Sequence, residues 1–136
     1  MSRYRRTSKK SKYYLEPETY DTVLHYARCY RSCLAELAVY DISKAIRYDQ
    51  PSVQANHNYD PVESAAIRRE VLWRKKLNIE AALDKAAPEE ILRKYLTMGV
   101  CDGKTYFQLQ QIGIPCSRVA YSAMRSRFYY ELAQMI

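Results

Sequence analysis

The scarcity of turn-forming residues is the feature that most constrains how this chain can fold. Its 136 residues include three glycines and five prolines, the residues on which tight turns most depend, so little turn chemistry is left for hairpins and sheets. Nearly half of the chain is apolar (48%), which is enough for a modest core. Leu, Ala, Glu, Lys and Arg favour helices and are common through the middle of the sequence. We therefore expect an all-α fold.

The first apolar stripe predicts a long N-terminal helix. It opens near Pro17, a residue suited to a first helical turn, and runs to about Tyr48. At about thirty residues, this helix would exceed the usual globular length, which suggests an extended antenna, a dimer seam or a break near Cys33. The apolar residues at helical spacing are Leu24, Ala27, Leu34, Leu37, Ala38, Ile42 and Ala45.

Two breaks divide the rest of the chain. Residues 48–61 lack periodicity and hold turn formers, so we expect a loop that ends with Asp60 as N-cap and Pro61 as the first residue of a second helix to about Ala86. A shorter helix follows, over 88–98, with Gly99 capping its end. The pair Asp102–Gly103 then marks a turn. We accordingly expect a helical body over 15–86 and a C-terminal module over 87–136.

The N-terminal fourteen residues form a basic block. The chain has a net charge of +7, and this block holds six basic residues and no acidic one. Such a run cannot pack, so residues 1–14 are predicted to be a disordered, solvated arm. Near a polyanion, its cations can release condensed counterions by neutralising phosphates, whereas the plainer interpretation is a solubility tail. The six residues are Arg3, Arg5, Arg6, Lys9, Lys10 and Lys12.

Residues Thr105 to Ile136 have the pattern of a helix, a tight turn and a second helix. Gly113 lies between two isoleucines, where a helix-turn-helix needs a residue that tolerates positive φ and two apolar anchors. Pro115 prevents the first helix from continuing, and Cys116 or Ser117 can begin the next. The pattern therefore predicts a helix-turn-helix module at this end of the chain.

The second helix of this pair is predicted to read DNA. Arg118, Tyr121, Ser122 and Arg125 follow i, i+3, i+4, i+7 and share one face, where arginines can reach guanine edges or phosphates and hydroxyls can bond either. Lys104 and Arg127 complete the candidate DNA-binding residues of this segment. The opposite face is expected to pack on the body and holds Val119, Ala120, Ala123 and Met124. The alternative is an amphipathic helix whose basic face is merely solvated.

No other chemistry stands out. His25, Cys29 and Cys33 are spaced by four and could hold zinc, but three ligands on one straight helix diverge, so we expect no metal and no cofactor. Only His25 and His57 could serve as imidazole bases, and no glycine-rich phosphate loop exists, so we do not expect an enzyme. The sequence lacks a secretory signal and an apolar span, which predicts a cytoplasmic protein that is not in a membrane and has reduced cysteines.

The segments YDQPSVQ…DPVE and GIPCSRVAYSAMRSRFYYELA resemble phage-encoded ArpU/RinA-like regulators of late genes in Gram-positive hosts. Their C-terminal module is similar to the promoter-reading domain of bacterial sigma factors. The likeness covers most of residues 15–136, and the aromatic-basic run after the turn is matched here by Arg125, Arg127, Phe128 and Tyr129. The resemblance implies activation of phage late genes at promoter DNA, with contact to host RNA polymerase.

Two other functions fit the same sequence. A small-terminase-like DNA-packaging protein also combines DNA binding with helical oligomerisation, although its helix-turn-helix would normally come first in the chain. A helical module could instead bind a protein such as RNA polymerase without touching DNA. Binding measured across a salt series separates the last function from the others, and the mass in solution separates an activator from a ring-forming packaging protein.

Overall fold

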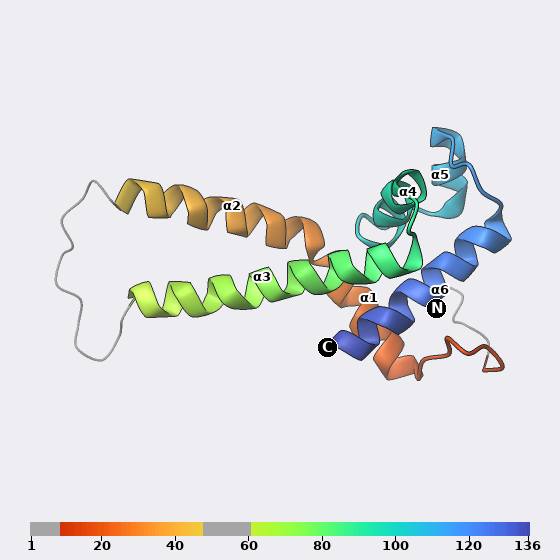
Figure 1. Ribbon diagram of the computed structural model, residues 1–136, viewed down its shortest axis with the longest axis horizontal. Helices are drawn as coiled ribbons and strands as arrows, with labels where there is room; N and C mark the ends of the chain where they lie inside the picture. Colours follow the sequence, from red (N-terminus) through yellow and green to blue (C-terminus); the bar gives the residue numbers. More distant parts are fainter. Residues whose placement is uncertain (1–8, 48–60) are drawn as a thin grey trace.

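The computed structural model describes residues 9–47 and 61–136, and every regular element in these ranges is a helix (Figure 1). The prediction of an all-α fold is confirmed for the described residues. No helix in these ranges is long and apolar enough to cross a bilayer. The elements are α1 (Pro17–Arg28), α2 (Tyr30–Arg47), α3 (Pro61–Ala86), α4 (Glu90–Val100), α5 (Tyr106–Ile112) and α6 (Arg118–Met135).

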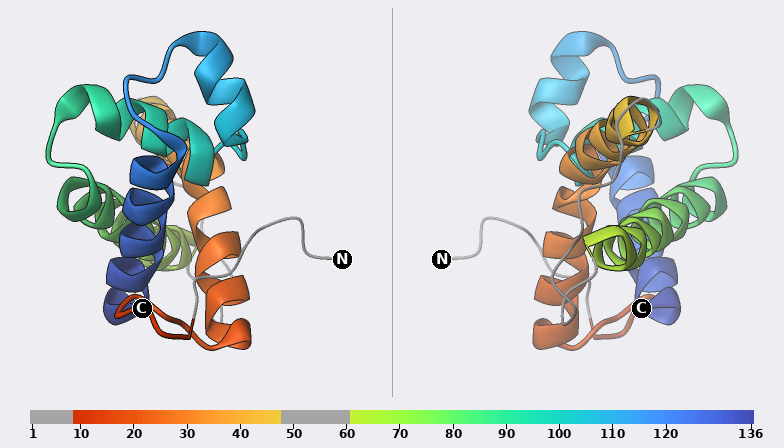
Figure 2. Two further views of the ribbon diagram at one scale, coloured as in Figure 1. Left: turned by 90° about the vertical axis from the view of Figure 1, so that its right-hand side faces the viewer. Right: turned by 90° about the vertical axis from the view of Figure 1, so that its left-hand side faces the viewer.

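The prediction of one long N-terminal helix is wrong, because the chain breaks at Cys29. The Cys29 backbone has φ −80° and ψ −5°, and α2 leaves the break in a clearly different direction from α1 (Figure 2). The two helices serve different surfaces, since α1 packs against α6 and α2 packs against α3. The break lies one turn before Cys33, near which a break was one of the three possibilities that the length of the apolar stripe suggested.

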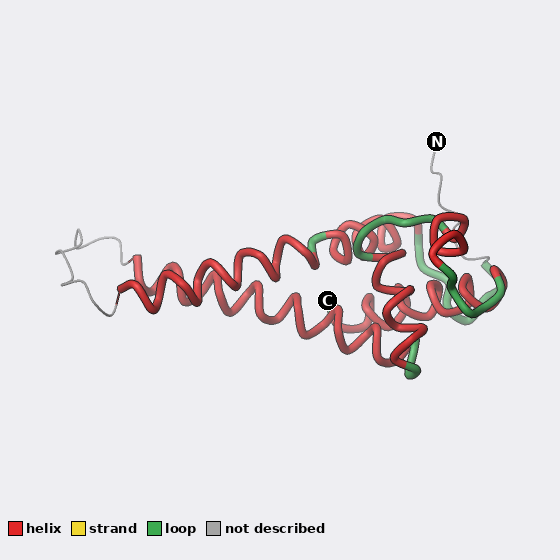
Figure 3. Tube along the Cα trace, turned by 90° about the horizontal axis from the view of Figure 1, so that it is seen from above, coloured by secondary structure: helices red, strands yellow, loops and turns green. Residues whose placement is uncertain are grey.

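Helices α2 and α3 lie side by side and project from the rest of the described chain (Figure 3). Their contact is held by a small buried cluster of Cys33, Leu37 and Leu72 and by an ion pair of 3.0 Å between Arg68 and Glu36. The predicted second helix is confirmed as α3, with 26 residues. The predicted loop and its N-cap, Asp60, lie outside the described residues.

The other helices share one core. The buried residues of α1, α3, α4, α5 and α6 form a single cluster, in which α6 packs against both α1 and α3. The ranges 15–86 and 87–136, which we expected to be a body and a separate module, therefore share their apolar interior. The side chains with almost no exposure include Val23, Ile79, Leu96, Val100, Leu109, Phe128 and Leu132.

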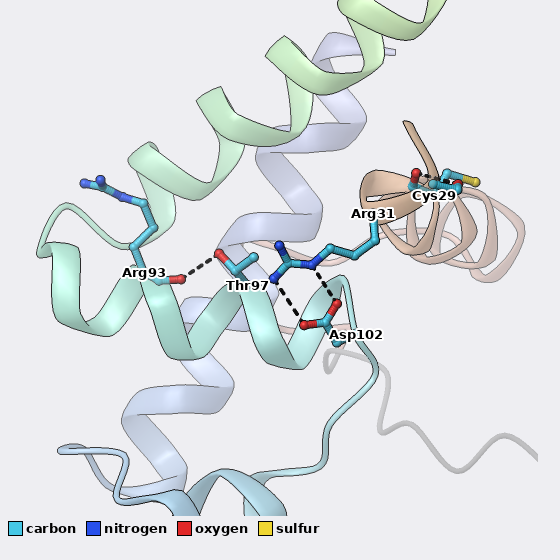
Figure 4. A network of polar contacts seen from close by, with 6 residues as sticks. Cys29, Arg31, Arg93, Thr97 and Asp102 are labelled. Carbon is cyan, nitrogen blue, oxygen red and sulfur yellow. Dashed lines mark hydrogen bonds and ion pairs between the residues drawn. The ribbon is translucent and has the colours of Figure 1, made fainter. Parts of the chain in front are cut away.

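Helix α4 does not end where the sequence suggested. It continues through Gly99 to Val100. Gly99 therefore does not cap the helix, and its role is in packing, because a Cβ there would collide with the hydroxyl of Tyr121 from α6. The turn predicted at Asp102–Gly103 is confirmed, with Gly103 at φ 78°. Arg31 of α2 donates to both carboxylate oxygens of Asp102 at 2.9 and 3.2 Å, which ties α2 to the end of α4 (Figure 4).

Candidate nucleic-acid interface

Helix α5 begins with a reciprocal cap. The backbone N–H of Gln108 donates to the side-chain oxygen of Thr105 at 3.3 Å, and the Thr105 N–H donates to the side-chain oxygen of Gln108 at 2.9 Å. This capping box satisfies two backbone donors that a free helix end leaves without a partner. All of its groups lie within four residues, so the start of α5 is determined locally.

The turn after α5 is a Schellman motif around Gly113. Its φ of 111° lies in the left-handed region, which confirms the predicted need for positive φ. The Gly113 N–H donates to the carbonyl of Gln110, and the Ile114 N–H donates to that of Leu109, both at 3.1 Å. Leu109 and Ile114 are both buried in the same core cluster, which is the apolar contact that accompanies this motif.

The start of α6 is held by two hydrogen bonds. Ser117 is the N-cap, and its hydroxyl accepts from the Ala120 N–H at 3.1 Å. The Tyr106 hydroxyl of α5 donates to the Cys116 carbonyl at 2.7 Å, which joins the two helices across the turn. The first turns of α6 are therefore presented in a fixed orientation relative to α5 (Figure 2).

The face of α6 that we expected to be exposed is partly buried. Tyr121 is 5% exposed, and with Phe128 and Leu132 it forms the buried stripe of α6. Val119, expected inside, is 80% exposed, and Ala120 and Ala123 are also exposed. The predicted assignment of faces was wrong because the body accommodates large aromatic side chains, not small ones. The helical spacing of Tyr121, Phe128 and Leu132, at i, i+7 and i+11, is the sequence signal that indicates the buried face of α6.

Arg125 takes part in the packing of α6 against α1. Its guanidinium donates to the Tyr20 hydroxyl at 3.1 Å and lies 5.4 Å from the centre of the Tyr129 ring. Tyr20 and Tyr129 themselves meet edge to face at 5.3 Å. Burial raises the pKa of Tyr129 to about 12, so its hydroxyl stays protonated at neutral pH. Burial likewise raises the pKa of Tyr121.

The exposed surface at the start of α6 combines two residues that we predicted to bind DNA with two that we expected to be buried. Arg118 and Ser122 are exposed, as expected for DNA-binding residues, and Val119 and Ala123 lie beside them. Val119, Ser122 and Ala123 follow i, i+3, i+4, so they share one side of the helix. We call this set, Arg118, Val119, Ser122 and Ala123, the α6 surface.

The other predicted basic residues are dispersed. Arg127 is half-buried, with its Nε 3.9 Å from a carboxylate oxygen of Glu131, and Lys104 is half-buried in the segment before α5. The exposed Lys12 ammonium lies 5.0 Å from the centre of the Tyr13 ring. Lys9 and Lys10 are exposed, whereas Arg3, Arg5 and Arg6 lie outside the described residues.

The arm is more ordered near its end than we predicted. Residues 9–13 form turns and a bend, and the Tyr13 ring packs 5.5 Å from that of Tyr130 on α6. Within the described part of the predicted arm, Tyr13 therefore packs against the body, whereas Lys9, Lys10 and Lys12 are exposed to solvent. The aromatic contact accounts for this, because a ring that reaches α6 gives the basic run a point at which to pack.

The segment of sequence that contains the α6 surface is basic. From Gly103 to Tyr130 the sequence has no acidic residue, and its four basic residues are Lys104, Arg118, Arg125 and Arg127. Opposing carboxylates therefore enter this segment only from other parts of the chain. Such a segment favours contact with a polyanion.

The cysteines show no assembled metal site. Cys29 Sγ lies 3.3 Å from the carbonyl oxygen of His25, to which it can donate, and no group of three potential ligands occurs within the described residues. Burial raises the pKa of the Cys101 thiol to about 12, so this group stays protonated at neutral pH.

Comparisons with known proteins do not classify the chain. No protein-family model matches it, and neither curated proteins nor solved structures yield a match. Its function must be inferred from the geometry and charge of the α6 surface.

Proposed function

We propose that this protein is a sequence-specific transcription regulator that binds double-stranded DNA with the α6 surface. The observation that carries the proposal is the exposure of Arg118, Val119, Ser122 and Ala123 at the start of a helix whose orientation is set by the Gly113 turn. In a helix-turn-helix, the N-terminal residues of the second helix contact base edges in the major groove.

The side chains of the α6 surface suit this role. Val119 and Ala123 are small, so the helix can approach the bases closely, and their methyl groups can contact the methyl group of thymine. The Arg118 guanidinium can reach guanine or phosphate, and the Ser122 hydroxyl can bond to either. Tyr121 and Arg125 would support this surface from inside, since both pack into the core.

The resemblance to phage late-gene regulators supplies the finer part of the proposal. We infer that the protein activates phage late genes at promoters used by host RNA polymerase. Phe107, Ile112 and Val119 are apolar side chains that are exposed on α5 and α6, which also favours a second candidate function, a module that binds a protein such as RNA polymerase without DNA.

Selection of bound sequences from a random duplex library, followed by mobility-shift titration, tests DNA binding. Arg118→Ala is expected to reduce the preference for the selected sequence over unrelated DNA by roughly tenfold to a hundredfold, the discrimination that one arginine–guanine contact provides. The fold should be unaffected, since Arg118 is exposed. Lys85→Ala is the matched control, because it also removes one cation. Lys85 lies on α3 beside Glu131, which is near the other end of α6.

Sequence-independent binding that Arg118→Ala leaves unchanged would contradict reading by α6. Absence of DNA binding in low salt, together with capture of purified host RNA polymerase that Val119→Asp abolishes, would instead support the protein-binding function.

A further inference from the structure

Helix α3 carries an exposed apolar ridge that no described helix covers. Ile67 and Val71 are one turn apart, and they are 60% and 50% exposed. A hollow lies on each side of them. One, of about 410 Å³, is lined by both α2 and α3, and the other, of about 540 Å³, extends over α3 toward Tyr26. Ile67 and Val71 line both hollows, so they form a ridge between two grooves.

The charges along this face are ordered. Glu63 lies one turn before the ridge, and Arg74 lies almost one turn after it, and both are exposed. Between the two ridge residues along the helix lies Glu70, which pairs with Arg74 at 3.8 Å, and Lys75 follows Arg74 on the same face. Read from the N-terminus, the face begins acidic, is apolar at its centre and ends basic. Turned end to end, the same face is basic, apolar and then acidic, so it is complementary to a second copy of itself.

We propose that α3 pairs antiparallel with α3 of a second copy, about a two-fold axis that crosses the helices near Arg69. In this arrangement, Ile67 of each copy meets Val71 of the other, and Glu63 of each copy meets Arg74 of the other. A two-fold interface uses the same patch on both subunits, so each favourable contact occurs twice.

The shape and the charges favour this arrangement together. Helices pack when the ridge of one enters the groove of the other. The α3 surface has a ridge with a hollow on either side, so the ridge of each copy can enter a hollow of the other. A parallel pairing would bring Glu63 against Glu63 and Arg74 against Arg74, which is repulsive. The antiparallel order replaces both repulsions with attraction.

The partner is a second copy because the complementary pattern is already present in this helix. A patch centred on two aliphatic side chains is small, so we expect an association that depends on protein concentration. The pairing does not depend on DNA binding. If the proposed DNA-binding function also holds, the dimer would present two α6 surfaces related by a two-fold axis, which suits a palindromic site.

Sedimentation equilibrium without DNA, at up to about 0.5 mM, where weak interfaces associate, tests the pairing by charge exchange. Glu63→Arg and Arg74→Glu should each raise the dissociation constant of the dimer by about tenfold, because two attractive pairs become repulsive. An equimolar mixture of the two variants should restore association. In the mixed dimer, the arginine introduced into one variant meets the glutamate introduced into the other, and the native Glu63 and Arg74 also meet.

Apolar variants provide the matched control. Ile67→Glu should abolish association, whereas Ile91→Glu should not, because Ile91 lies on α4 with a similar exposure of 57%. A wild-type protein that remains monomeric at the highest concentration would overturn the proposal. So would association unaffected by Ile67→Glu, or a mixture of charge variants no tighter than either variant alone. Melting temperatures show that each variant is folded.

Discussion

The contact between Gly99 and Tyr121 shows how a single residue positions the candidate interface. Gly99 is buried inside α4, where glycine has a poor helical propensity, and the Tyr121 hydroxyl occupies the space that a Cβ would need. Tyr121 also packs against Tyr106 of α5, with the ring centres 5.7 Å apart. The same ring therefore links α4, α5 and α6, directly beneath the α6 surface.

Gly99→Ala is therefore expected to destabilise the protein. In an exposed helix this change would stabilise by about 1 kcal/mol, but here the added methyl group must displace the Tyr121 ring, at a net cost of roughly 1–3 kcal/mol. Urea unfolding measures the loss. Tyr121→Phe removes the colliding oxygen, so the double variant should lose less than the sum of the two single changes. Additive losses would contradict a direct collision.

At the scale of elements, the junction of α5 and α6 depends both on hydrogen bonds that end α5 and on a buried side chain that holds the turn in the core. The Schellman hydrogen bonds end α5, while the buried Ile114 anchors the turn in the core. Positive φ at Gly113 costs nothing for glycine but is strained for any residue with a Cβ. The orientation of α6 therefore depends on that one backbone conformation.

We expect Gly113→Ala to lower the free energy of unfolding by about 1–2 kcal/mol, the cost of a left-handed conformation for an L-residue. Chemical denaturation monitored by circular dichroism gives the value. Gln111→Ala is the control, because Gln111 is exposed in the same helix and such surface changes usually stay within about 0.5 kcal/mol. Equal stability of the two variants would mean that the turn tolerates a Cβ.

At the scale of the whole molecule, the charge is concentrated at one end of the sequence. Six of the 22 basic residues lie in the first fourteen, and the rest of the chain has 16 basic and 15 acidic residues. Lys9, Lys10 and Lys12 are exposed near the part of the chain that packs on α6. If DNA binds, these residues and the arginines before them should add affinity without sequence preference.

Changing Arg3, Arg5 and Arg6 together to glutamine should weaken binding to all DNA sequences alike. The slope of the logarithm of affinity against the logarithm of salt concentration should become shallower by up to about 2.7, at about 0.9 for each phosphate that the arm no longer neutralises. Mobility-shift titrations between low and moderate salt measure the slope. Tyr13 is left intact, so the aromatic contact with α6 remains.

A second triple variant loses three charges at exposed positions elsewhere and should keep most of the wild-type slope. These positions are Arg69, Lys85 and Lys94. Two variants with the same slope would show that only net charge matters, and that the N-terminal arginines make no phosphate contacts of their own.

Much of the fold could be predicted from the sequence because the signals are local. The capping box of Thr105 and Gln108, positive φ at Gly113 and the Ser117 cap each involve groups within a few residues of one another. Pro17 and Pro61 begin α1 and α3 as expected. These features follow from backbone sterics and hydrogen bonds that form in any context, so the sequence alone determined the helical class and most of the helix boundaries.

The tertiary structure decided which surfaces of those helices remain exposed. Periodicity divides α6 into two faces, but it does not say which face the body covers; that depends on the space left by α1, α3 and α4, which accommodates Tyr121 and Phe128 and leaves Val119 outside. The helical Gly99 has the same origin. It follows from a contact with Tyr121, a residue far away in the chain, whose energy outweighs the local preference that the sequence displays.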